Sequence, residues 1–180
     1  MNTAMSIDNS GAMPAPPPAA TRLIGLRVVL IVAALFEAFN GFASFAATIG
    51  DSSHHGAQGL AGTLTTAQIA SHPFLATATL VFALIGRVRD AIIAMAAILA
   101  MNWLSEMPSV VLRGFELNDP TNAPLVLSQI VAYPLMAACA IALARRGERL
   151  GIATTLVALP TLFAWAGVTA FAIAVSIHGF

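Results

Sequence analysis

The stretch that decides the fold is residues 23–49, which read LIGLRVVLIVAALFEAFNGFASFAATI. Only two of these side chains are charged, those of Arg27 and Glu37. As a helix with a rise of 1.5 Å per residue, the stretch is about 40 Å long, and the hydrocarbon core of a bilayer is about 30 Å thick. We therefore predict a transmembrane helix here.

The composition of the whole chain indicates the same class of protein. Of its 180 residues, 58% are hydrophobic and only 9% are charged, and the mean hydropathy is +0.85. A soluble domain carries about a quarter charged residues, so this chain has too few to cover a globule in water. The formal net charge of zero leaves no basic surface to attract phosphates. These values exclude a soluble enzyme, a nucleic-acid binder and a disordered protein, and they predict an all-α integral membrane bundle.

Five apolar stretches are long enough to span a bilayer. The second contains Pro73, which either lies inside one long helix or begins a shorter one. The first also has an alternative interpretation as a cleaved signal sequence, which would leave four spans. Residues 1–21 are rich in proline and predict a disordered tail before a bundle over 22–180. The predicted spans are 23–49, 64–86, 90–112, 123–144 and 150–177.

The arginines predict how the bundle is oriented. Seven of the eight lie before or at the start of the first span, between spans two and three, or between spans four and five, so they occupy one side of the membrane. By the positive-inside rule this side is the cytoplasm, which puts the tail inside and the C-terminus outside. We expect a multi-pass protein of a bacterial-type inner (plasma) membrane. The seven arginines are Arg22, Arg27, Arg87, Arg89, Arg145, Arg146 and Arg149.

Polar residues within the predicted spans fall at one depth. Counted along the spans from Arg22, Arg87, Arg89 and Arg145, they lie about 20–27 Å from the cytoplasmic end, in the outer-leaflet half. Each needs a partner, because a polar group facing lipid is costly. We therefore expect them to face the bundle interior as a candidate ligand-binding layer. The candidates are Glu37, Asn40, His72, Asn102, Glu106 and Gln129.

Helix packing is the competing interpretation of such polar stripes. Small and hydroxylated residues, here Gly41, Thr154 and Thr161, usually allow helices to approach closely. The amides of the candidate layer would then form hydrogen bonds between helices. Glu37 and Glu106 favour a functional role more strongly, because a carboxylate is expensive in a membrane.

The chemistry of the layer stays open at this stage. Glu37, His72 and Glu106 are candidate metal ligands, and they also suit proton exchange with a bound quinone or substrate. No catalytic motif occurs, so we assign no catalytic residue and identify no cofactor.

Two function classes therefore compete. We expect a small membrane protein that acts as an accessory subunit or a ligand-binding bundle. The alternatives are a membrane-embedded enzyme or a quinone- or metal-binding redox protein, and a proton-coupled transporter. The expected partners are the lipid bilayer and either a larger membrane complex or a second copy of the chain, with no nucleic acid.

Overall fold

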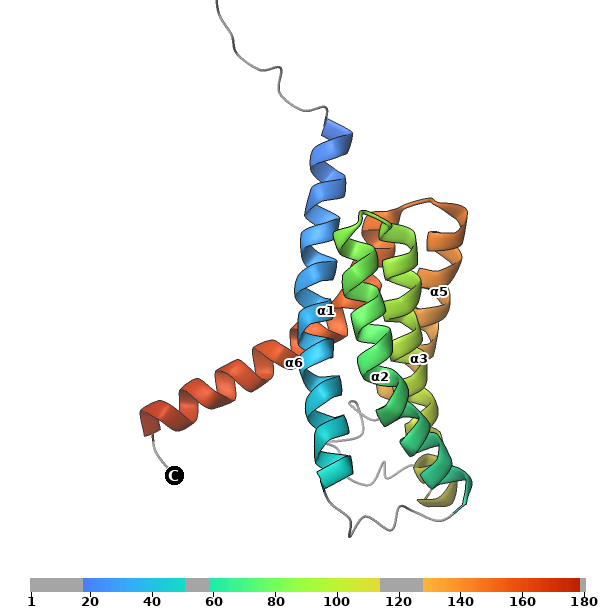
Figure 1. Ribbon diagram of the computed structural model, residues 1–180, viewed down its shortest axis with the longest axis vertical. Coiled ribbons are helices and arrows are strands. Elements are labelled where there is room, and N and C mark those ends of the chain that lie inside the picture. Colours follow the sequence, from blue (N-terminus) through green and yellow to red (C-terminus); the bar gives the residue numbers. More distant parts are fainter. Residues whose placement is uncertain (1–17, 51–58, 114–127, 179–180) are drawn as a thin grey trace, which may run out of the picture.

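The computed structural model describes residues 18–50, 59–113 and 128–178, and nearly all of them are helical. Helices α1, α2, α3 and α5 run side by side in a bundle, and α6 crosses it obliquely (Figure 1). The elements are α1 (Pro18–Gly50), α2 (Leu60–Leu84), α3 (Val88–Arg113), a π-helical turn η1 (Ser128–Ala132), α5 (Tyr133–Arg146) and α6 (Leu150–His178). The predicted all-α class is confirmed.

Four of the described helices are long and apolar enough to cross a membrane. These spans are Thr21–Thr48, Leu60–Leu84, Val88–Pro108 and Leu150–Ile177. They correspond to the first, second, third and fifth predicted spans. The predicted fourth span, 123–144, is described only from Ser128 onward, as η1 and α5.

Two helix starts differ from the expected boundaries. Helix α1 begins at Pro18, so the end of the predicted tail is already helical, while residues 1–17 lie outside the described chain. Proline suits the first turn of a helix, where its missing N–H would have no partner, and two alanines follow it. Helix α2 begins at Leu60, which answers the question about Pro73: the proline lies inside one continuous helix.

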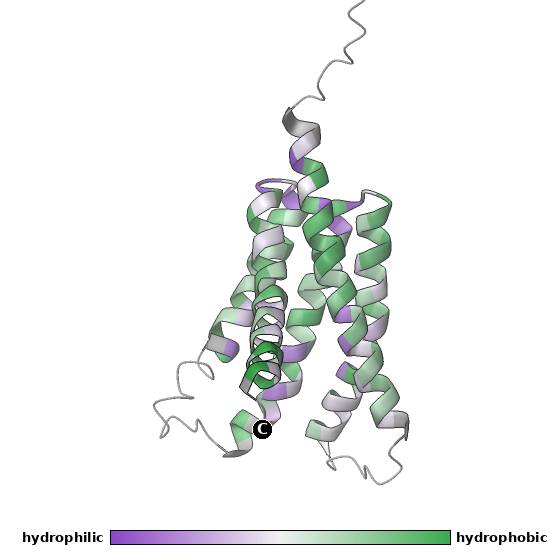
Figure 2. Ribbon diagram, turned by 90° about the vertical axis from the view of Figure 1, so that its left-hand side faces the viewer, coloured by the Kyte–Doolittle hydropathy of each residue, from purple (hydrophilic) through white to green (hydrophobic). Residues whose placement is uncertain are grey.

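The ends of α2 and α5 lie at the same end of the bundle, and an arginine side chain lies against each turn. The guanidinium of Arg27 donates hydrogen bonds to the carbonyls of Ala83 (3.1 Å) and Leu84 (2.6 Å), which have no partner within α2. Helix α5 ends at Gly147 with φ +70°, a left-handed conformation that favours glycine. A Cβ at this position would also collide with the guanidinium of Arg89. Figure 2 shows hydrophilic residues at these turns, at the upper end of the bundle, and a second set along the lower half of the helices.

The helices pack around an alanine-rich core. Each of α1, α2, α3 and α5 contacts the next, and α6 contacts α5, α3 and α1. Small side chains let helices approach closely, which drives packing where lipid removes the hydrophobic effect. The fully buried larger residues include Leu30, Ile92, Met95, Ile98 and Val157.

The second half of α6 projects away from the other helices (Figure 1). Its apolar side chains are exposed, with Val168, Phe171 and Ile177 at 62%, 63% and 69%. Pro160 lies where α6 still contacts the bundle, and a proline inside a helix removes a backbone hydrogen bond. Helix α6 therefore covers only part of the bundle's side.

Candidate functional site

Glu37 and His72 form a buried pair between α1 and α2. The Nε2 atom of His72 lies 2.7 Å from Oε2 of Glu37, and each side chain is only 11% exposed. The hydroxyl of Thr161 on α6 donates a hydrogen bond of 2.5 Å to Oε1 of Glu37. Both carboxyl oxygens thus have a partner, as burial of a carboxyl group requires.

The pair extends to α3 through two amides. The Nε2 atom of Gln68, one turn before His72, lies 3.4 Å from Nδ1 of the imidazole. The same Nε2 donates to Oδ1 of Asn102 at 2.9 Å. The amide of Gln68 thus lies between the imidazole of His72 and the amide of Asn102. A hydrogen-bonded network therefore links α6, α1, α2 and α3, and we call Thr161, Glu37, His72, Gln68 and Asn102 the polar network.

A close approach of α1 and α2 sets the position of the pair. A Cβ at Gly41 would lie 3.0 Å from the backbone nitrogen of Pro73 and 3.2 Å from Cδ2 of His72. Glycine removes that side chain, and proline has no N–H that the contact would leave unsatisfied. Gly41 and Pro73 together bring His72 within hydrogen-bonding distance of Glu37.

Aromatic rings pack α6 on α1 beside the carboxyl group of Glu37. The ring centroids of Phe36 and Trp165 are 3.7 Å apart, and Phe39 meets Trp165 edge-on at 6.5 Å. Trp165 lies one turn beyond Thr161. These contacts hold the crossing of α6 at the level where Thr161 reaches Glu37.

The polar network forms part of the wall of a cavity of about 620 Å³. All helices of the bundle contribute to this wall, and η1 contributes Gln129 and Ile130. The indole nitrogen of Trp103 donates to the carbonyl of Ile130 at 2.9 Å, which ties η1 to α3. Single π-helical turns occur frequently beside functional sites.

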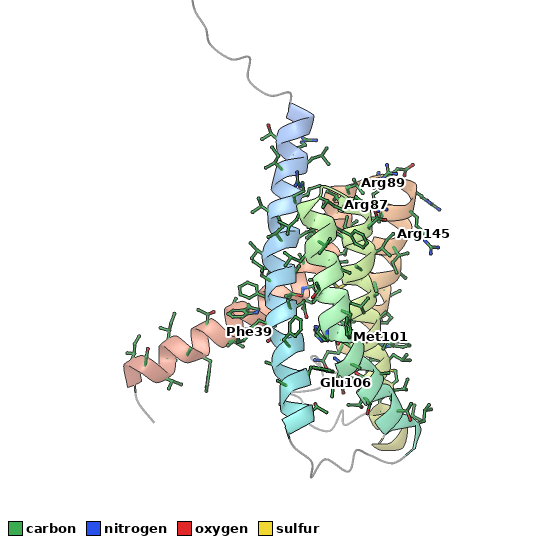
Figure 3. All side chains as sticks on the ribbon, in the orientation of Figure 1. Phe39, Arg87, Arg89, Met101, Glu106 and Arg145 are labelled. Carbon is green, nitrogen blue, oxygen red and sulfur yellow. The ribbon has the colours of Figure 1, made fainter. Side chains whose placement is uncertain are left out.

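All six candidate residues from the sequence line this one cavity. Glu37, His72 and Asn102 are joined in the polar network, whereas Asn40, Glu106 and Gln129 are exposed on the cavity wall. Glu106 lies toward the end of the bundle opposite Arg87, Arg89 and Arg145 (Figure 3). Among the residues the structure describes, no three His, Cys, Asp or Glu side chains come close enough to hold a metal ion. Glu37, His72 and Glu106 are therefore not assembled as a three-ligand metal site.

Two members of the polar network were not among the candidates. Thr161 was interpreted as a packing residue, yet its hydroxyl binds Glu37. Gln68 connects His72 to Asn102. Its spacing of four residues from His72 was the available signal, because side chains at i and i+4 lie on one face of a helix.

Comparison with protein-family models, curated proteins and solved structures finds no match. Any proposal about function therefore rests on the geometry of this cavity.

Proposed function

We propose that this chain is a small multi-pass membrane protein that binds a small molecule in the cavity, with the Glu37–His72 pair as its polar anchor. The observation that carries the proposal is the position of this pair. It lies 11% exposed in the wall of a cavity of about 620 Å³, instead of being sealed between helices. Ligand sites typically enclose about 300–1,000 Å³ and contain convergent polar groups that fix the orientation of the ligand.

Packing alone does not require these residue types. The core of the bundle packs with alanine and aliphatic side chains, which carry no desolvation cost. An intramembrane carboxyl group with a histidine partner is by contrast expensive and marks ligand sites and proton pathways. The polar network fixes both side chains in one orientation, as a binding site needs.

We further propose that the end of the bundle with the arginine turns faces the cytoplasm. Arg87, Arg89 and Arg145 lie at one end (Figure 3), and Arg27 lies against the end of α2 there. The cavity then lies toward the outer leaflet of a bacterial-type plasma membrane.

Blocking the cavity tests the binding proposal. Ser44 is exposed on the cavity wall, whereas the neighbouring Ala43 is exposed but does not line the cavity. Purified wild-type protein, incubated with an extract of small molecules and lipids from the cells that express it, should show a bound adduct in native mass spectrometry. Ser44→Trp and Glu37→Gln should lose the adduct, and Ala43→Trp should keep it. A wild-type protein that stays bare under these conditions contradicts the proposal.

An accessory subunit is the second candidate function, and α6 is the observation that favours it. Val168, Phe171 and Ile177 are exposed on a helical segment that leaves the bundle. If the chain belongs to a larger complex through this segment, native electrophoresis of mildly solubilised membranes should show it well above its 18.6 kDa mass. Deleting residues 166–180 should then return it to the size of a monomer, whereas a ligand-binding monomer should migrate alone in both cases.

A further inference from the structure

The ionisable side chains described in the wall of the cavity include carboxylates but no arginine. Its wall contains two carboxylates, those of Glu37 and Glu106, and one histidine, His72. Seven arginine side chains are described, and none of them lines the cavity. The chain has no lysine. The described wall therefore provides negative charge and no permanent positive charge.

This charge composition discriminates between ligands. With His72 neutral, the Glu37–His72 pair carries one negative charge, and with His72 protonated the pair carries none. In neither state does the pair favour an anion. Charges interact several times more strongly at a partly buried site than in water, so a positive ligand gains and a negative one loses.

Two aromatic side chains in the wall suit the same class of ligand. Trp103 and Tyr133 both line the cavity. The N–H of Trp103 is already donated to the carbonyl of Ile130, so its ring is what remains to interact with a ligand. Aromatic rings attract ammonium and other onium cations through their quadrupole.

We propose that the cavity binds a lipophilic organic cation, a protonated amine or an onium ion, through the carboxylate of Glu37. This inference rests on the proposed ligand-binding function and names the class of ligand. The polar network holds Glu37 in place, and the aromatic rings add cation–π contacts. The described wall offers no arginine or lysine that could pair with a lipid phosphate or a fatty-acid carboxylate.

A pair of probes that differ in the sign of their charge tests the inference. Tetraphenylphosphonium and tetraphenylborate have nearly the same size and shape, and binding to the purified full chain in detergent is measured by equilibrium dialysis. We expect the cation to bind at least about tenfold more tightly than the anion. Glu37→Gln should weaken binding of the cation by about tenfold or more. Asp90→Asn should not, because Asp90 pairs with Arg87 at the other end of the bundle.

A second variant keeps the test decisive if Glu37→Gln fails to fold. Ser44→Arg places a positive charge on the exposed wall of the cavity, and Ala43→Arg places the same charge just outside it. Only Ser44→Arg should abolish binding of the cation. The inference is overturned if the anion binds as tightly as the cation, if the cation does not bind, or if neither Glu37→Gln nor Ser44→Arg weakens binding of the cation.

An adduct from cell extract that persists in native mass spectra while tetraphenylphosphonium fails to bind would refute the cation class and leave the binding proposal standing. If the wild-type protein shows neither an adduct from cell extract nor binding of tetraphenylphosphonium, both the cation class and the binding proposal are refuted.

Discussion

Two threonines on α6 form a matched pair that tests the polar network. Thr161 and Thr154 are both buried, 5% and 1% exposed, and lie about two helical turns apart on one face. The hydroxyl of Thr161 donates to Glu37, whereas that of Thr154 has no hydrogen-bond partner among the described residues. Substitution by valine removes the hydroxyl and keeps the shape of each side chain.

The two substitutions should change the free energy of unfolding in opposite directions. Thr161→Val leaves Oε1 of Glu37 without its donor in a buried site. Hydrogen bonds to charged groups contribute about 1.5–3 kcal/mol in soluble proteins, and those between membrane helices about 0.6 kcal/mol on average. We therefore expect Thr161→Val to cost about 1–2 kcal/mol. Thr154→Val removes a hydroxyl that is desolvated without compensation, so it should be neutral or stabilise by up to about 1 kcal/mol.

Equilibrium unfolding measures both values. The purified full chain in mixed micelles is titrated with dodecyl sulfate, and unfolding is followed by the fluorescence of Trp103 and Trp165. Wild type and both variants should show one transition with equal slopes, so that shifts of the midpoint report stability. Equal effects of the two substitutions, or a Thr161→Val variant as stable as wild type, would refute the stabilising role assigned to the Thr161–Glu37 hydrogen bond.

Three further predictions concern the backbone and the orientation of the chain. Gly41→Ala should destabilise by about 1–3 kcal/mol in the same titration, because its Cβ would lie 3.0 Å from Pro73. Gly25→Ala on the same helix meets no atom within 4 Å and should be neutral or slightly stabilising, so equal effects would contradict the close approach of α1 and α2. Gly147→Ala should cost about 1–2 kcal/mol through its left-handed backbone alone, and an unchanged midpoint would argue against this turn. Reporter fusions after Val88 should report the cytoplasm and fusions after Phe180 the outer compartment, whereas a cytoplasmic signal at Phe180 would refute the proposed orientation.

Helices and polar depth could be predicted because both depend on local sequence. Long apolar stretches satisfy every backbone hydrogen bond only as helices, which placed α1, α2, α3 and α6 within a few residues of their ends. A fixed rise per residue then put Glu37, His72 and Asn102 at one depth without knowledge of their neighbours. Local rules also have limits: the π-helical turn at Ser128–Ala132 leaves no trace in hydrophobic periodicity.

The partners of each polar group were decided only by tertiary structure. Helix periodicity could place Thr161 and Thr154 on one face of α6, yet only the crossing of α6 over α1 gives Thr161 a carboxylate and leaves Thr154 without a partner. The close approach of Gly41 to Pro73 was likewise decided by tertiary structure, because it depends on how α1 and α2 pack against each other. By itself the sequence determined a membrane bundle with polar groups at one depth. The cavity follows from how the helices pack, since packing depends on contacts between residues far apart in the chain.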